Sequence, residues 1–289
     1  MRKMTGAMMA LIMCLAMGTA MASQLPTLQD QYNITVPDGM NSVFFGRPSG
    51  YTGGIGGEDQ EVEANCITGQ VWDLEGMFFS TSTLEFRMVG GYDFINGYQG
   101  WTSGDIFISR GMPYYGDAGE GGNPLPSGAD KSKMSSYLYD WVVDVDWLSP
   151  TLAYTVYAVG PETPVNVVYY TQNNGSNPWR RSSGGTQIDT GNFLSQKGLT
   201  DSDTGFLGGA HNMVTFDMSG WLLAALGLQP GDTVTDDLWF HFTMECGNDN
   251  MMGTLGGGWK TPPPVPEPAS IGILGLGILG IIATRMRRR

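Results

Sequence analysis

The chain has 289 residues, including 43 glycines and 16 prolines, and only 15% of its residues are charged. Asp and Glu outnumber Lys and Arg by 28 to 15, which gives a formal net charge of −13. A protein that binds a phosphate backbone needs a basic surface, so this charge argues against nucleic acid as a partner. The two histidines leave little material for a His-rich metal centre.

Residues 1–22 have the pattern of a secretory signal peptide. Arg2 and Lys3 supply the positive start, an apolar run follows, and Ala20-Met21-Ala22 is a small-x-small site for cleavage before Ser23. The alternative is an N-terminal membrane anchor, for which the apolar run is too short.

The body of the chain, residues 23–260, is predicted to be all-β, with an antiparallel β-sandwich or jelly-roll fold. Its clearest strand lies in residues 137–147, where Tyr139, Trp141, Val143, Val145 and Trp147 are expected on one face and Asp140, Val142, Asp144 and Asp146 on the other. The other predicted strands are Tyr32–Val36, Asn41–Phe45, Val71–Phe79, Thr83–Val89, Asp105–Ser109, Leu152–Val159, Val165–Thr171, Met213–Met218 and Val234–Cys246. No helices alternate with these strands, so a parallel sheet is not expected.

One helix is predicted over residues 221–226, with Ser219 as its N-cap and Gly227 at its end. Residues 111–136 and 172–210 show no period and are rich in Gly, Ser and Asn. Connections this long are usually functional or disordered, so both are predicted to be long loops.

Cys66 and Cys246 are the cysteines that remain once the signal peptide is removed. In an oxidising compartment such a pair most simply forms a disulfide, and two free thiols are the alternative. The strand that ends at Cys246 supports burial of this cysteine, since its alternation groups it with an apolar face made of Leu238, Phe240, Phe242 and Met244.

Calcium is a candidate ligand because it takes six to eight oxygens from carboxylates, amides and backbone carbonyls. Asn248, Asp249 and Asp105 have suitable side chains near predicted strand ends, although no EF-hand pattern is present. The alternative is turn chemistry, in which Asn and Asp bond to their own backbone.

Sugar stacking is the second candidate form of binding. Trp101, Trp179 and Trp259 stand in Gly-, Ser- or Asn-rich surroundings, as does Tyr98. The alternative for each ring is packing in the core of the sandwich.

No catalytic residue is assigned from the sequence. A G-x-S-x-G motif is absent, and His211 and His241 are expected to be packed or surface residues rather than general bases. Asp140, Asp144 and Asp146 have a spacing that permits glycoside hydrolysis, but any acidic strand face would meet that spacing. The sequence therefore favours a protein that is not an enzyme.

The last residues form three consecutive parts. A proline-rich linker over 261–268 contains Pro266, Glu267 and Pro268, and an uncharged apolar stretch over 269–284 is predicted to be a single transmembrane helix. As a helix this stretch spans about 24 Å, slightly less than the ~30 Å hydrocarbon core of a bilayer. The basic tail, residues 285–289, contains Arg285, Arg287, Arg288 and Arg289, which the positive-inside bias would keep cytoplasmic.

This order closely resembles the PEP-CTERM sorting signal. The resemblance implies that an exosortase-like membrane transpeptidase of a Gram-negative bacterium cuts near residues 266–268 and delivers the body to the cell surface or the exopolysaccharide matrix. For the acidic, disulfide-tied body we expect a non-enzymatic role in adhesion or scaffolding, with exopolysaccharide as a candidate partner and Ca²⁺ as a candidate bridging ion. The alternative is a secreted carbohydrate-active enzyme or carbohydrate-binding module on the same β-sandwich.

Both cuts would make the body more acidic. Nine basic and 27 acidic residues would remain between residues 23 and 266, a formal charge of −18. Such a charge keeps a secreted protein soluble and repels anionic polymers that no cation bridges.

Overall fold

The computed structural model describes residues 32–36, 70–116, 123–206, 208–235 and 237–256. The predicted signal peptide, the strand Asn41–Phe45, Cys66, Trp259 and the segments from residue 261 onward lie outside these residues. Within the described ranges, no helix combines the length and apolar character needed to cross a bilayer.

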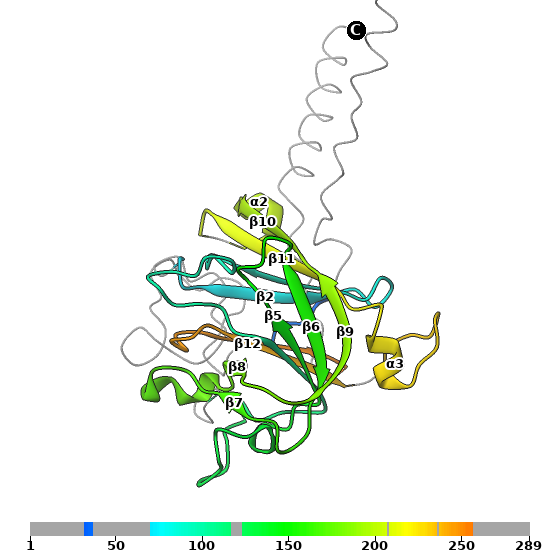
Figure 1. Cartoon of the computed structure of the whole chain (residues 1–289). Helices are drawn as coiled ribbons and strands as arrows, with labels where there is room; N and C mark the ends of the chain where they lie inside the picture. Colours follow the sequence, from blue (N-terminus) through cyan, green and yellow to red (C-terminus); the bar gives the residue numbers. More distant parts are fainter. Residues whose placement is uncertain (1–31, 37–69, 117–122, 207, 236, 257–289) are drawn as a thin grey trace, which may run out of the picture.

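Two antiparallel sheets pack face to face, as the sequence predicted (Figure 1). The first sheet contains, in spatial order, β1 (Tyr32–Asn33), β2 (Leu74–Phe79), β3 (Glu85–Gly90), β11 (His211–Asp217) and β10 (Leu194–Leu199). The second contains β13 (Asn250–Leu255), β12 (Leu238–Thr243), β4 (Ile106–Arg110), β5 (Trp141–Val145), β6 (Ala153–Ala158) and β9 (Thr186–Asn192). The all-β sandwich is thereby confirmed.

The main core lies between the two sheets and is rich in aromatic rings. Trp141, Val143 and Val145 of β5 enter it, as do Leu238, Phe240 and Phe242 of β12 and, after that strand ends, Met244 and Cys246. The rings of Phe86 on β3 and Phe240 on β12 stack across the interface with centroids 4.8 Å apart. The period-two pattern therefore predicted the buried faces of β5 and β12 correctly.

Tyr139 is an exception to the predicted alternation. It packs with Phe107 and Val142 on the outer side of the second sheet rather than in the main core. The strand begins only at Trp141, and Leu138 before it has a φ of 69°. The backbone therefore bends before the strand, and the alternation does not extend back to residue 139.

The sheets are joined along both edges. On one side, the chain that leaves β1 bridges to β13, with Val36 N donating to Met252 O at 2.9 Å and Thr254 N donating to Ile34 O at 2.7 Å. Gly253 lies at this junction, where a Cβ would come within 2.9 Å of Met77 Sδ. On the other side, β9 passes directly into β10 through the buried Phe193, so that one continuous segment forms an edge of each sheet.

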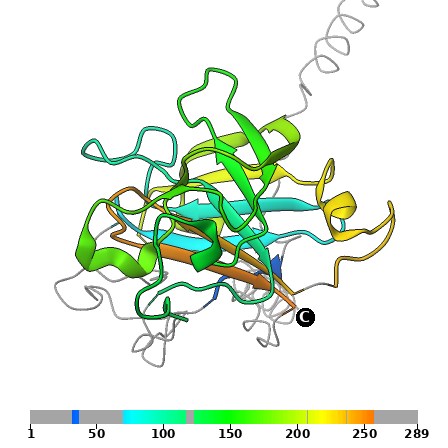
Figure 2. The same cartoon turned by 60° about the horizontal axis from the view of Figure 1, so that its bottom comes forward.

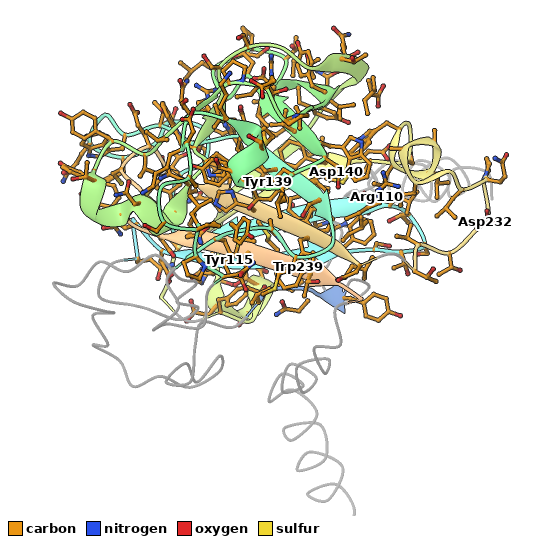
Figure 3. The ribbon with its side chains drawn as sticks, turned by 90° about the horizontal axis from the view of Figure 1, so that it is seen from below. Arg110, Tyr115, Tyr139, Asp140, Asp232 and Trp239 are labelled. Atoms are coloured by element: carbon orange, nitrogen blue, oxygen red, sulfur yellow. The ribbon has the colours of Figure 1, made fainter. Side chains whose placement is uncertain are left out.

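A smaller layer covers the outer face of the second sheet (Figure 2). It contains the two-stranded ribbon of β7 (Val165–Asn166) and β8 (Arg180–Arg181) and the 3₁₀ turns Met134–Ser136 and Thr171–Ser176. Figure 3 looks onto this side and shows Tyr139 over the sheet, and Tyr115 beside Trp239 on β12 with ring centroids 5.9 Å apart.

Two further local predictions were wrong. The expected strand Val165–Thr171 ends after Asn166, because the chain turns into the 3₁₀ segment that begins at Thr171. The expected loop 172–210 contains β8, β9, β10 and the short helix α2 (Asp201–Thr204). These edge strands carry mostly exposed polar residues, so they have no apolar alternation to detect.

The predicted helix is present as α3 (Leu222–Leu226), and Gly227 ends it with a φ of 75°, as expected. Its N-cap is Trp221 rather than Ser219. The backbone N–H of Ser219 instead donates to Asp217 Oδ1 at 2.9 Å, within the turn before the helix.

Candidate functional site: an exposed aromatic stripe

Five aromatic rings from three separate segments meet on one side of the domain. We call this set, Trp72, Tyr98, Trp101, Tyr169 and Tyr170, the aromatic stripe. Trp72 contacts Tyr98 edge to face with ring centroids 4.8 Å apart. The ring centroid of Trp101 lies 5.1 Å from that of Tyr169 and 5.5 Å from that of Tyr170, and the centroids of the two tyrosine rings are 5.1 Å apart.

A tight hairpin places the middle of the stripe. Tyr98 and Trp101 are direct antiparallel partners, with Trp101 N donating to Tyr98 O at 2.9 Å and Tyr98 N donating to Trp101 O at 3.1 Å. Gln99 and Gly100 between them both have positive φ, which is the conformation of a two-residue hairpin turn. Directly opposed residues project to the same face, so this turn holds the Trp72–Tyr98 pair next to Trp101.

Hydrogen bonds at the base of this hairpin fix its position. Asp93 Oδ1 accepts from the backbone N–H groups of Ile95 and Asn96, both at 3.1 Å. The buried Tyr92 donates its hydroxyl proton to Trp101 O at 3.0 Å. The hairpin is therefore tied both to its own turn and to the core.

The rings are open to solvent although their bases are packed. Tyr169 is 66% exposed, and Tyr98 and Tyr170 are each 36% exposed. Trp72 and Trp101 are partly buried against the main core. Tyr169 is also held through its backbone, since its N–H donates to Glu245 O at 2.7 Å. An anchored but exposed arrangement of this kind is typical of a binding surface.

The charges beside the stripe are acidic. Glu245 Oε2 accepts from the N–H of Thr102 at 3.3 Å and from its hydroxyl at 3.0 Å. Asp93 Oδ2 accepts from Lys197 Nζ at 2.7 Å, and this ion pair and the bonds to Asn96 lower the pKa of the Asp93 carboxyl. The ammonium group of Lys197 is thus already paired with the carboxylate of Asp93.

The three tryptophans predicted to stack on sugars have different positions. Trp101 is central to the stripe. Trp179 is half-buried, its carbonyl accepts from Asp105 N at 3.0 Å, and the Arg180 guanidinium covers its ring at 5.6 Å from the centroid. Trp259 lies outside the described residues. The geometry therefore supports a surface role for one of the three rings.

Sequence reasoning missed Trp72, Tyr169 and Tyr170, because each fell within a predicted strand. Trp72 lies in the turn before β2, and the two tyrosines follow β7. The adjacent Tyr169-Tyr170 pair was the available signal. Neighbouring residues of a strand point to opposite faces, so in a strand with one buried face one of these two tyrosines would be exposed.

The residues proposed for calcium have other bonds. Asp105 is buried beneath the β7–β8 ribbon, where its carboxylate accepts from Arg181 N at 2.8 Å and Val145 N at 3.2 Å, and Arg180 Nε lies 3.6 Å away. Burial and the nearby Asp144 raise its pKa to about 7. The guanidinium and the two amides already satisfy this carboxylate without a metal.

Asp249 is also buried and accepts from two amides, Leu74 N on β2 and Asn250 N, both at 2.8 Å. Asn248 precedes it and is half-buried. Within the described ranges, no three His, Cys, Asp or Glu side chains gather as metal ligands. These positions lend the calcium prediction no support, and it stays a prediction.

The acidic strand considered for hydrolysis has structural bonds. Asp140 Oδ2 accepts from Arg110 N at 2.7 Å, and these two residues lie side by side in Figure 3. Asp144 pairs with the Arg181 guanidinium, which also lies over the ring of Tyr157.

His211 stands between two carboxylates. Its Nδ1 lies 2.7 Å from both oxygens of the buried Glu75 on β2, and its Nε2 lies 3.0 Å from Asp201 Oδ1 on α2. Gln70 Nε2 donates to Glu75 Oε1 at 2.9 Å. The bonds to both carboxylates outweigh burial and raise the pKa of His211, while burial raises the pKa of Glu75.

His241 has a different environment. It lies in β12 on the face of Trp239 and Thr243, and it stacks near Tyr139 with ring centroids 5.7 Å apart. Among the described residues, neither ring nitrogen makes a hydrogen bond of good geometry. Burial is the main cause that lowers its pKa to about 3. His241 is therefore neutral at physiological pH.

Cys246 is buried in the main core. Its predicted partner Cys66 lies outside the described residues, so the disulfide stays a prediction.

Comparison with known proteins settles the identity of the end of the chain. Residues 264–289 match the model of the PEP-CTERM protein-sorting motif. The chain ends in a PEP-CTERM sorting motif. A protein with this motif is exported and processed by an exosortase, which is the sorting predicted from Pro266-Glu267-Pro268 and the basic tail. No curated protein and no solved structure matches the chain.

Proposed function

We propose that the β-sandwich is a non-enzymatic adhesive component of the cell surface or of the extracellular polysaccharide matrix. Its C-terminal PEP-CTERM motif supports delivery outside the cell. The aromatic stripe carries the adhesive part of the proposal, since it presents three exposed tyrosine rings held beside two partly buried tryptophans. Aromatic residues of this kind dominate the energetics of recognition surfaces.

The ion pairs and hydrogen bonds of the second sheet favour adhesion over hydrolysis. A glycosidase needs two carboxyl groups opposed across the scissile bond, one of them free to give a proton. The carboxylates of Asp140 and Asp144 are instead bonded to a backbone N–H and to an arginine. They stabilise the joint between β4, β5 and β8.

Fractionation of the host cells tests the sorting and the location together. Intact-mass spectrometry of the surface fraction is expected to find a protein that lacks residues 269–289, and immunolabelling is expected to find it in the matrix. Replacement of Pro266-Glu267-Pro268 by three alanines should leave the full tail in place and hold the protein in the membrane fraction. Surface protein that retains its tail would refute the processing.

Calcium bridging is tested by the same fractionation. If Ca²⁺ links the acidic body to an anionic polymer, EDTA is expected to release the protein from the matrix and Mg²⁺ is not expected to restore it. Retention that is insensitive to EDTA would remove calcium from the proposal and leave adhesion through the aromatic stripe.

A further inference from the structure

We infer that the aromatic stripe is a stacking site for an uncharged polysaccharide chain, an inference that rests on the adhesive function proposed above. The ring of a neutral sugar has an apolar face of C–H groups and a rim of hydroxyls. Its ideal partner is therefore a flat apolar ring with hydrogen-bonding groups close by, which is the combination that this surface presents.

The stripe meets the first requirement because its three tyrosine rings are exposed and all five rings are packed against a neighbour. Trp72 and Trp101 are fixed against the main core, and the contacts of Trp101 with Tyr169 and Tyr170 hold the two tyrosines. A tyrosine side chain has only two rotatable bonds to restrain, so binding here would cost little conformational entropy.

The shape of the stripe favours a chain over a single sugar. The Trp72–Tyr98 pair and the group of Trp101, Tyr169 and Tyr170 are separate ring clusters that the hairpin at residues 98–101 joins. Each cluster offers its own stacking position, so successive residues of one polymer would contact both. Weak contacts along a chain then add up to a useful affinity.

The charges select an uncharged ligand. Glu245 and Asp93 lie at the base of the stripe, and the lysine in contact with Asp93 is already paired. An anionic sugar would meet these two like charges, and Lys197 is already paired with Asp93. Glu245 Oε2 already accepts from Thr102, which leaves Oε1 as an acceptor for a sugar hydroxyl in the part of the chain that the structure describes.

The test uses the mature exported protein and the host's own exopolysaccharide, separated by anion exchange into a neutral and an acidic fraction. Affinity electrophoresis in gels that contain each fraction is expected to retard the wild-type protein in the neutral fraction only. Tyr169→Ala removes a ring that is 66% exposed, so the fold should persist and the affinity should fall about fivefold or more. Tyr169→Phe keeps the ring and should retain most of the affinity.

Tyr32→Ala is the matched control. Tyr32 is 57% exposed and pairs with Phe79 at the end of β2 that lies away from Trp72. This variant should bind the neutral fraction as the wild type does. Equal binding by Tyr169→Ala, or wild-type binding to the acidic fraction alone, would overturn the inference.

The matrix assay separates this inference from the proposed function. If Tyr169→Ala stays in the matrix at wild-type levels, the stripe is not the adhesive site, although the adhesive function stands. If the wild type is absent from the matrix, the adhesive function fails as well. A wild-type dimer in light scattering that Tyr169→Ala converts to a monomer would assign the stripe to self-association and would also refute the inference.

Discussion

The surroundings of the two histidines differ in a way that their burial does not reveal. His211 and His241 are both fully buried in β-strands, one in each sheet. Two carboxylates bond to His211 and favour its protonated form, whereas His241 lies among Phe107, Tyr139 and Asn250 and remains neutral. Burial alone therefore does not set the charge of a histidine, and the specific partners decide it.

Replacement of each histidine by leucine should give the largest difference in unfolding free energy between the two sites. His211→Leu leaves Glu75 and Asp201 facing each other without their cation, and we expect a loss of about 3–5 kcal/mol of unfolding free energy. His241→Leu removes a neutral ring from an apolar setting and should cost less than about 1.5 kcal/mol. Urea unfolding of both proteins measures the difference. Equal losses would show that His211 carries no charge.

Glu75→Gln tests the carboxylate partner with its shape retained. The amide can accept one hydrogen bond from His211, but it supplies no negative charge, so we expect a loss of about 2 kcal/mol. Glu162→Gln is the matched control, because Glu162 forms an exposed pair with Lys133 at 3.2 Å and its replacement should change the unfolding free energy by less than about 0.5 kcal/mol. A loss as small as that of the control would argue against a buried ion pair at Glu75.

The pH dependence should have opposite signs for the two histidines. The pKa of His211 is raised, so its stabilising effect is complete below about pH 6.5 and is lost as the pH rises through the folded value. The pKa of His241 is lowered to about 3, so its effect is complete above about pH 6.5 and is lost as the pH falls toward 3. The pKa of Glu75 is also raised, so its contribution to the unfolding free energy, like that of His211, falls as the pH rises through the folded value.

Nuclear magnetic resonance reads both groups directly, because the chain contains two histidines. The ring signal of His211 should titrate above pH 6.5, and that of His241 should stay constant down to about pH 4. In Glu75→Gln, the His211 titration should shift to lower pH while that of His241 is unchanged. A His241 signal that titrates near pH 6.5 would contradict its burial.

Asp201→Asn should have the smallest effect of this series. The side chain of Asp201 is 44% exposed, so solvent screens its interaction with His211 Nε2. We expect a loss below about 1 kcal/mol and a small decrease in the pKa of His211. A loss as large as that of Glu75→Gln would mean that the exposed carboxylate is the main partner of the imidazolium.

The sequence predicted what depends on local alternation. The buried faces of β5 and β12, the position of Cys246 in the core and the end of α3 at Gly227 were all visible in it. The partners of His211 were not, since Glu75 lies on β2 and Asp201 on α2, and only the pairing of β2, β3 and β11 brings them together. A single sequence contains no signal for such distant pairs.

The candidate site was predicted only in its central residue. Trp101 was proposed because it lies in a segment rich in Gly, Ser and Asn, but its contacts with Tyr169 and Tyr170 depend on where the chain leaves β7.

The polar edge strands were missed because they too depend on contacts with distant segments. β9 and β10 gain their backbone hydrogen bonds from β6 and β11, and their side chains add little apolar burial.

The junction at β13 has a mechanical consequence. This strand is bonded along its length to β12 on one side and to residues 34–36 on the other. A pull on the chain beyond Leu255 would load both rows of hydrogen bonds in shear, so that several must break at once before the strand can slide. A domain tethered at that end would therefore resist drag from moving fluid without unravelling.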